Sequence, residues 1–142
     1  MRNTKMASDH IFRAQRCLKE AELALSEEDY AGVVRRSQEA LELAIKAVLR
    51  YLTIEYPREH DVSGVLVQVE NRLPNYLIER LQDIVELSAE LARVRGPALY
   101  GYEIEGIPAR ESFGRDYAEN IYRRVKEIVN LCSEFLKTSI KF

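Results

Sequence analysis

Two arginines and a tyrosine are the residues of this sequence best suited to bind a ligand, and they share the segment Arg93-Val94-Arg95-Gly96-Pro97-Ala98-Leu99-Tyr100-Gly101. An arginine guanidinium is a planar fork of N–H donors that matches phosphate oxygens, and a tyrosine ring offers a face on which a base stacks. Arg93, Arg95 and Tyr100 are therefore the candidate ligand-binding residues, for a nucleotide or an RNA strand. The same residues also fit a plain helix terminus, since cations suit the negative end of the helix dipole.

Histidine offers a second kind of chemistry, because an imidazole transfers protons near neutral pH. The sequence contains His10 and His60, and His60 is followed directly by Asp61. One interpretation makes His60 a general base that the neighbouring carboxylate orients. The other, which we prefer, makes it a capping or surface histidine, because structural roles outnumber catalytic ones. His60 and Arg93 are the candidates for any catalytic role.

Signatures of metal and cofactor sites are missing from the sequence. It has no Gly-rich phosphate loop ending in Lys-Ser or Lys-Thr, no Cys-x-x-Cys pair and no His-Glu-x-x-His motif. We therefore expect no metal and no cofactor. The 21 basic and 23 acidic residues give a net charge of −2. This balance removes the simplest argument for a basic nucleic-acid coat protein, but it leaves room for a local basic patch.

Apolar residues recur at three- and four-residue steps and predict the helices that must position these side chains. The expected helices cover residues 8–26, 33–52, 62–69, 75–95 and 117–136. Pro57 bounds the second helix, and Gly96-Pro97 is expected to end the fourth. Residues 96–114 hold four of the six glycines and two of the four prolines, so they form one long loop.

The predicted fold is all-α, a single domain over residues 1–142. It is an antiparallel up-and-down bundle of four long helices and one short helix. Glu42 and Lys46 lie four residues apart and off the main apolar stripe, so we expect an exposed ion pair there. Because no apolar run approaches the roughly 18 residues needed to cross a bilayer, we expect no membrane association and a cytoplasmic protein.

Three stretches resemble a known family, the HEPN domains (higher eukaryotes and prokaryotes nucleotide-binding), particularly small stand-alone prokaryotic members. They are Tyr30-Ala31-Gly32-Val33-Val34-Arg35-Arg36-Ser37-Gln38-Glu39-Ala40-Leu41-Glu42-Leu43-Ala44-Ile45-Lys46-Ala47, the pair His60-Asp61, and Arg95 through Tyr100-Gly101. The resemblance extends over about residues 8–138. It implies a helical bundle that binds a nucleotide or RNA and forms a homodimer.

Many HEPN proteins are metal-independent ribonucleases, whose motif is an arginine, four to six residues, a histidine and usually a tyrosine two places on. With Arg93 at the arginine position and Tyr100 at the tyrosine position, Ala98 stands where the histidine should be. Starting from Arg95 does not supply one, because no histidine follows His60. General acid–base catalysis contributes about 10²- to 10⁴-fold, so the resemblance implies binding without efficient cleavage.

Two further functions stay open. HEPN proteins commonly accompany small nucleotidyltransferases in toxin–antitoxin pairs, so the resemblance also implies a helical partner subunit, with Tyr100 a candidate target for nucleotide transfer. The other function is a ribonuclease with a rebuilt site. In that site Arg93 or Arg95 holds the phosphate, and His60 or Tyr100 transfers protons.

Overall fold

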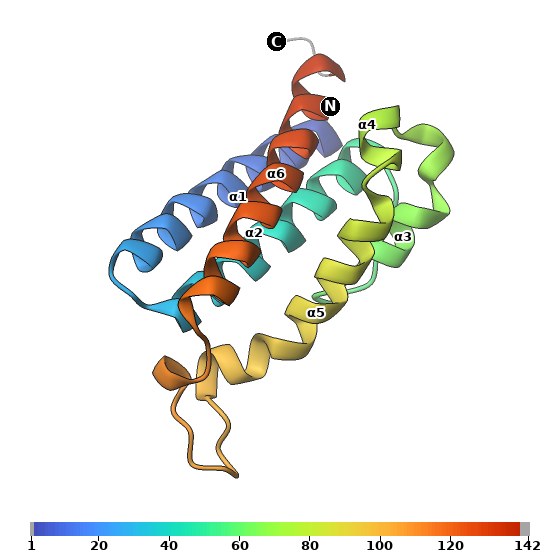
Figure 1. Cartoon of the computed structure of the whole chain (residues 1–142). Coiled ribbons are helices and arrows are strands. Elements are labelled where there is room, and N and C mark those ends of the chain that lie inside the picture. Colours follow the sequence, from blue (N-terminus) through green and yellow to red (C-terminus); the bar gives the residue numbers. More distant parts are fainter. Residues whose placement is uncertain (1, 140–142) are drawn as a thin grey trace.

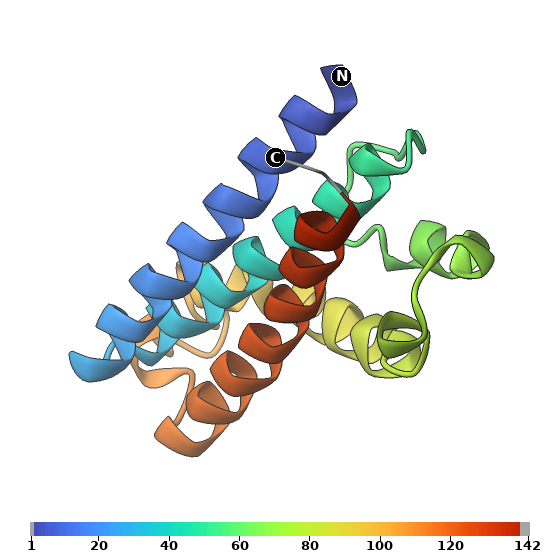
Figure 2. The ribbon, with the colours of Figure 1, turned by 90° about the horizontal axis from the view of Figure 1, so that it is seen from above.

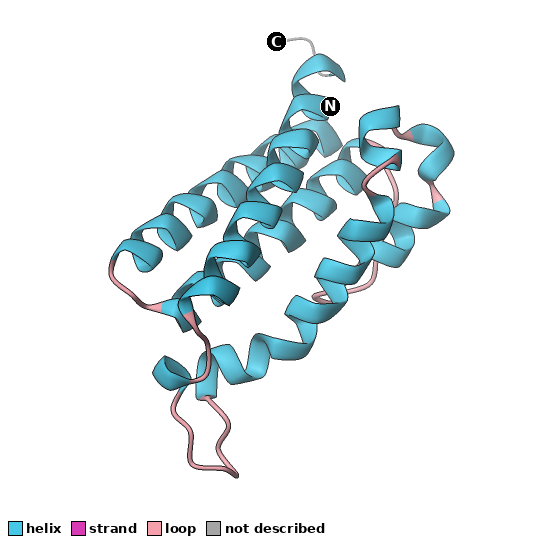
Figure 3. Ribbon diagram, in the orientation of Figure 1, coloured by secondary structure: helices cyan, strands magenta, loops and turns pink. Residues whose placement is uncertain are grey.

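The computed structural model describes residues 2–139, and the fold over this range is all-α, as predicted. The long helices are α1 (Arg2–Ser26), α2 (Tyr30–Tyr51), α5 (Leu81–Tyr100) and α6 (Arg115–Ser139). The connections contain the short helices α3 (Ser63–Gln68) and α4 (Asn75–Ile78) and the 3-10 turns η1 (Glu70–Arg72) and η2 (Ala109–Glu111) (Figure 3). The predicted short helix at residues 62–69 is α3. The predicted 75–95 helix is interrupted, because its first turn forms α4 and residues 79–80 separate α4 from α5. Residues 1 and 140–142 of the predicted domain lie outside the described range.

Successive long helices run in opposite directions, as in an up-and-down bundle (Figure 1). Helix α2 is central and packs against α1, α5 and α6. Figure 2 shows that the segment with α3 and α4 projects to one side of the four long helices. The connection from α2 to α3, residues 52–62, turns back along α2. Its Tyr56 ring lies over Lys46, and His60 contacts Glu42.

The core consists of apolar side chains that recur at helical spacing on facing sides of the long helices. Burying one large aliphatic side chain stabilises the fold by about 1.5–3 kcal/mol, so these stripes dominate the folding free energy. The largest fully buried side chains of α2, α5 and α6 include Leu41, Ile45, Leu49, Ile84, Leu87, Leu91, Ile121 and Ile128. The same packing fixes the rotation of α2 and α5, and so it sets the direction in which their neighbouring polar side chains point.

Helix α1 begins at Arg2 and not at the predicted cap, Ser8. Ala7 is fully buried, which carries the apolar stripe of α1 one turn further toward the N-terminus than the sequence analysis recognised. The acidic connection to α2 is where the sequence predicted it, and Asp29 caps α2 by accepting a 2.9 Å hydrogen bond from the backbone N–H of Gly32.

The predicted end of the 75–95 helix at Gly96-Pro97 is wrong, because α5 continues through both residues to Tyr100. An interior proline costs a helix about 3 kcal/mol, since it removes an N–H donor and crowds the preceding turn. Here Val94 and Ala98 are buried on the apolar stripe, and Arg35 donates a 3.4 Å hydrogen bond to the carbonyl of Ala98. Tertiary packing thus retains a final turn that the local sequence disfavours.

Gly101 ends α5 and begins a hairpin-like loop that extends away from the bundle (Figure 1). Its φ of 74° lies in the left-handed region, and a Cβ there would meet the carbonyl oxygen of Ile107 at 2.2 Å. Tyr102 and Ile107 exchange backbone hydrogen bonds of 2.8 and 3.0 Å, which close the loop at its base. Ile104 near the tip is 98% exposed. The irregular connection is therefore residues 101–114, shorter than the predicted 96–114.

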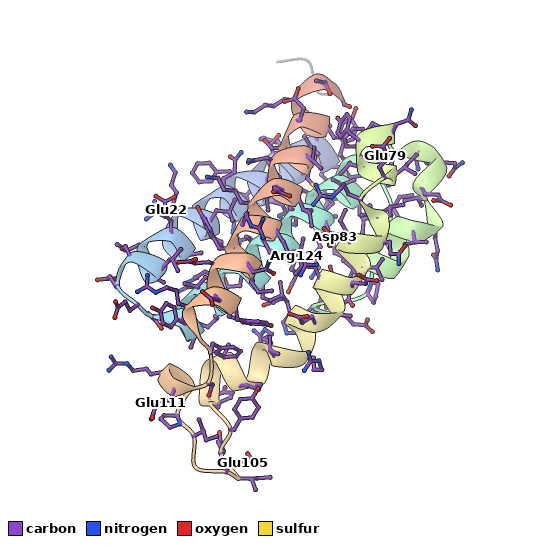
Figure 4. All side chains as sticks on the ribbon, in the orientation of Figure 1. Glu22, Glu79, Asp83, Glu105, Glu111 and Arg124 are labelled. Atoms are coloured by element: carbon purple, nitrogen blue, oxygen red, sulfur yellow. The ribbon has the colours of Figure 1, made fainter. Side chains whose placement is uncertain are left out.

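Helices α5 and α6 are joined by an ion-pair cluster around Asp83 (Figure 4). Arg124 of α6 donates to one carboxylate oxygen at 2.7 Å, and Arg80 donates to the other at 3.0 Å. Burial opposes ionisation of Asp83, but the hydrogen bonds from Arg124 and Arg80 outweigh it and lower the pKa of the carboxyl group. This cluster fixes the spacing of the two helices that flank the loop.

Candidate functional site

The predicted ligand-binding residues Arg93, Arg95 and Tyr100 do not form one pocket. Each lines a different hollow around the C-terminal half of α5. Residues two apart on a helix are turned by about 200°, so Arg93 and Arg95 necessarily leave α5 on opposite sides. The three side chains leave the same helix, α5, toward three separate hollows.

Arg95 lines a cavity of about 140 Å³ that also contains His60. Four parts of the chain meet there: α1 contributes Arg13, α2 contributes Gln38, Glu39, Glu42 and Leu43, the 52–62 connection contributes His60, and α5 contributes Arg95. We call this the Arg95 cavity. Of the combinations that the sequence analysis left open for a rebuilt ribonuclease site, this cavity contains Arg95 with His60. Arg93, the other arginine considered there and the catalytic candidate named beside His60, lies in another hollow.

His60 is held by Glu42 of α2. Its Nδ1 atom lies 2.9 Å from Oε1 of Glu42, and about half of its side chain is exposed. Because an ionised carboxylate only accepts hydrogen bonds, this contact assigns the proton of a neutral imidazole to Nδ1 and leaves Nε2 as the acceptor. A carboxylate behind one ring nitrogen and a free basic nitrogen on the other is the arrangement of an oriented general base.

Asp61, the carboxylate that the sequence suggested as the partner of His60, does something else. Its Oδ1 atom accepts hydrogen bonds from the backbone N–H of Ser63 at 3.0 Å and from the Ser63 hydroxyl at 2.7 Å. These contacts form a turn that starts α3. Asp61 thus holds the turn just before α3, and Glu42 takes the orienting position beside His60.

Glu42 accepts hydrogen bonds from three side chains. Besides His60, Gln38 donates to its Oε1 at 2.8 Å, and Lys46 donates to its Oε2 at 2.9 Å. Burial disfavours the ionised form of Glu42, but the hydrogen bonds from Lys46, Gln38 and His60 outweigh that effect and lower the pKa of the carboxyl group. The carboxylate is therefore ionised at neutral pH.

The prediction of an exposed pair between Glu42 and Lys46 is wrong. Their side chains are 18% and 15% exposed, because the 52–62 connection covers this part of α2. Tyr56 of the connection places its ring 5.5 Å from Nζ of Lys46. The helical periodicity located both residues off the apolar stripe, but it carried no information about which segment would cover them.

The carboxylates around the Arg95 cavity are paired with cations, but not every arginine there is paired with a carboxylate in the part of the chain that the structure describes. Glu42 is neutralised by Lys46, and Glu39 pairs with Arg36 at 3.1 Å. Within residues 2–139, Arg95 has no carboxylate oxygen within 4.0 Å, and Arg13 has only a 3.9 Å contact with Asp9. The half-buried guanidinium of Arg95 is consequently available to an anionic group that enters the cavity.

Arg93 lines a second cavity, of about 290 Å³, together with aromatic residues from the loop and α6. Phe113 and Tyr117 stack with their ring centroids 5.8 Å apart, and Tyr102 faces the same hollow. The Tyr117 hydroxyl donates a 2.7 Å hydrogen bond to Glu90. Burial first, and then this carboxylate, raise the pKa of Tyr117 well above its ordinary value. This cavity offers aromatic surface beside a positive charge.

Tyr100 lies in a third hollow at the base of the loop, and 68% of its surface is exposed. Sequence reasoning named Tyr100 but missed Tyr102 and Tyr117, although the aromatic residues flanking the glycine-rich loop were a usable signal. It also missed Glu42 as the partner of His60. Only the crossing of the 52–62 connection over α2 brings that pair together.

No group of three or more His, Cys, Asp and Glu side chains able to hold a metal ion occurs within residues 2–139. None of the helices described is both long and apolar enough to cross a membrane.

Comparison with known proteins adds two findings. The family model described as HEPN domain matches residues 7–135. A protein of Methanocaldococcus jannaschii named "Putative toxin MJ1304" is 28% identical over 141 residues, which cover 95% of this chain and 91% of that protein. No solved structure matches the chain.

Proposed function

The chain belongs to the HEPN family, and on that premise we propose that it is an RNA- or nucleotide-binding module that uses the Arg95 cavity to hold a phosphate group. The observation that carries the proposal is the pairing of charges in this cavity. Arg95 has no carboxylate partner among the described residues, while the neighbouring carboxylates Glu39 and Glu42 each have a cation of their own. An arginine without a carboxylate partner beside a small cavity is suited to bidentate phosphate binding.

RNA fits the arrangement better than a single nucleotide. Arg93, Arg95 and Tyr100 line three separate hollows, and one mononucleotide cannot occupy all three. A single strand of several nucleotides can follow the end of α5, with phosphates at the arginines and a base stacked on Tyr100 or in the aromatic cavity beside Arg93. Stacking on aromatic side chains and phosphate contacts are the usual elements of single-strand binding.

The relative from Methanocaldococcus jannaschii is named as a toxin, which supports a place for this chain in a toxin–antitoxin pair. We propose the toxin position, with a small nucleotidyltransferase as partner, a homodimer as the assembly and the cytoplasm as the compartment. Tyr100 is the proposed acceptor if the partner transfers a nucleotide, because its hydroxyl-bearing ring is largely exposed.

A ribonuclease with a rebuilt site is the second candidate, and a specific contact favours it. The imidazole of His60 is oriented by Glu42 at 2.9 Å and lines the same cavity as Arg95. In this mechanism Arg95 holds the scissile phosphate, and Nε2 of His60 accepts the proton of the attacking 2′-hydroxyl as its oxygen bonds to phosphorus. The bond from phosphorus to the 5′-oxygen of the next nucleotide breaks, and that leaving oxygen takes a proton from water. The histidine that the family motif places after the arginine would thus come from another part of the chain.

The deciding experiment uses the purified protein and a 5′-labelled pool of structured RNAs in the presence of a chelator. Binding is measured by filter retention and cleavage by gel, for the wild type, Arg95→Ala and Arg93→Ala. We expect binding that weakens steeply with salt, a loss of about tenfold in affinity for each variant and no cleavage. Arg123→Ala is the matched control, because Arg123 is an exposed arginine on α6 outside these three hollows.

Unchanged binding in Arg95→Ala, with the control also unchanged, contradicts the phosphate-binding role of the Arg95 cavity. His60→Gln is assayed for cleavage beside these variants. If the wild type cleaves RNA and both Arg95→Ala and His60→Gln do not, the protein is a ribonuclease with a rebuilt site and the proposed binding module is wrong.

A further inference from the structure

A further cavity of the described structure lies outside the Arg95 cavity, at the C-terminal end of α2. It measures about 430 Å³ and is bounded by the start of α1, the last turn of α2 and the first part of the 52–62 connection. Arg50 and Arg58 supply positive charge, Asn3 and Thr53 supply neutral polar groups, and Glu55 adds a carboxylate. We call this the Arg50 cavity.

Both arginines of this cavity lack a partner within residues 2–139. Neither has a carboxylate oxygen within 4.0 Å, in contrast to Arg36, Arg80, Arg115 and Arg124. The Nε atom of Arg50 is buried and has no hydrogen-bond partner. A buried donor without a partner is unfavourable, and an anion bound in the adjoining cavity would satisfy it.

Further positive charge surrounds the Arg50 cavity on the side of α1. Tyr56, which lines the cavity, has its hydroxyl 3.5 Å from Nε2 of His10. Burial lowers the pKa of His10, and the charges of Arg13, Arg50 and Lys46 lower it further, against an opposing effect of Asp9. Three cations and one carboxylate thus act on the His10 position, and this excess of positive charge favours an anion nearby.

One face of α2 connects the Arg50 cavity to the Arg95 cavity. Glu42, Lys46 and Arg50 follow one another at four-residue steps, so they lie in a row along the helix. Glu42 lines the Arg95 cavity, and Lys46 lies beneath the Tyr56 ring that borders the Arg50 cavity. Eight residues of helix separate Glu42 from Arg50, a distance of about 12 Å along the axis. A single strand of a few nucleotides spans such a distance.

We propose that the Arg50 cavity is a second phosphate-binding subsite, which holds the backbone of an RNA strand a few nucleotides away from the phosphate at Arg95. The proposal rests on the proposed function and deepens it, because it makes the ligand a strand that must be long enough to reach both cavities. Arg50 and Arg58 bind the distant phosphate, and Asn3 and Thr53 donate to its remaining oxygens. Glu55 at the rim opposes this binding.

The test compares a dinucleotide, which is too short to reach both cavities, and a twelve-nucleotide RNA of unstructured sequence, each 5′-labelled, by fluorescence anisotropy at several salt concentrations. The variants are Arg58→Gln, Arg50→Gln, Glu55→Gln and Arg95→Ala. Arg72→Gln is the matched control, because Arg72 is an exposed arginine outside both cavities. Arg58 and Glu55 are exposed, so their variants probe the subsite without disturbing the core.

Arg58→Gln and Arg50→Gln are each expected to weaken binding of the long RNA about tenfold. They should also reduce the magnitude of its salt slope by about 0.7. Neither should change binding of the dinucleotide, and Glu55→Gln should strengthen binding of the long RNA.

The two proposals fail in different ways. If the long RNA loses affinity in Arg95→Ala but not in Arg58→Gln or Arg50→Gln, the second subsite is wrong and the proposed function stands. An equal loss for both RNAs in Arg58→Gln also overturns the second subsite. If the wild type binds neither RNA, or Arg95→Ala binds both like the wild type, the proposed function and the inference built on it are wrong together.

Discussion

The imidazole of His60 and the carboxylate of Glu42 are hydrogen-bonded at 2.9 Å, although 18 positions separate them in the chain. The contact exists because the connection after α2 folds back along the helix it has just left. It gives the histidine an orienting carboxylate and brings it to the cavity that Arg95 lines. The contact therefore places an imidazole with an orienting carboxylate in the same cavity as the Arg95 guanidinium, although these residues are far apart in the sequence.

Glu42→Gln is expected to lower the free energy of unfolding at pH 7 by about 1–3 kcal/mol, because it leaves the largely buried Lys46 without its carboxylate. The pKa of Glu42 is lowered from its ordinary value of 4.5, so its stabilising effect is complete above that value. The effect is lost as the pH falls toward the folded-state pKa. Urea denaturation at pH 7 and at about pH 3.5 should therefore give a smaller difference between wild type and variant at the lower pH.

Glu79→Gln serves as the control for Glu42→Gln, because Glu79 is an exposed residue of the α4–α5 turn (Figure 4). A Glu42→Gln variant as stable as this control at pH 7 would contradict the stabilising role of the carboxylate.

His60→Gln is expected to change the free energy of unfolding by less than about 0.5 kcal/mol, because half of the side chain is exposed and it fills no core position. In the binding module it should leave RNA affinity within about threefold of wild type, since Arg95 supplies the charge. Urea denaturation and anisotropy measure the two effects. A loss of stability above 2 kcal/mol, on the order of a buried network, would mean that His60 is mainly structural.

Gly101→Ala is expected to lower the free energy of unfolding by about 2–3 kcal/mol. The residue would be forced to a positive φ, and its Cβ would meet backbone atoms of Ile107, Pro108 and Ala109. Gly106→Ala is a matched control, because Gly106 has a φ of 69° but open space around its Cβ position, so its loss should be about 1 kcal/mol. Thermal unfolding followed by circular dichroism compares the two. Equal losses would show that the close approach at Gly101 adds nothing.

Asp83 and Arg124 are expected to be energetically coupled across α5 and α6. Their side chains are about 30% exposed and meet at 2.7 Å. A double-mutant cycle with Asp83→Asn and Arg124→Gln should give a coupling energy of about 0.5–1 kcal/mol in 50 mM salt. In 1 M salt the coupling should shrink, because the Debye length falls to about 3 Å. A coupling indistinguishable from zero in low salt would reduce the pair to a surface contact without energetic effect.

The sequence by itself determined the fold class and most of the helices. Apolar residues at three- and four-residue steps record which face of each helix is buried, and that information is local. The prediction of helix ends from this local signal failed at Gly96-Pro97, where the burial of Val94 and Ala98 maintains a turn that the local sequence disfavours. The predicted start of α1 was also wrong, because Ala7, in the second turn of the helix, is a weak hydrophobic signal.

The site was determined only in part by the sequence. Residue types named Arg95 and His60, because guanidinium and imidazole groups have recognisable chemistry wherever they stand. The divergence of Arg93 and Arg95 follows from helix geometry alone. Tertiary structure decided that Arg95 and His60 line one cavity, and that Glu42 replaces Asp61 beside His60 because the 52–62 connection crosses α2. Periodicity encodes the face of a helix, but contacts between segments depend on the path of the chain between them.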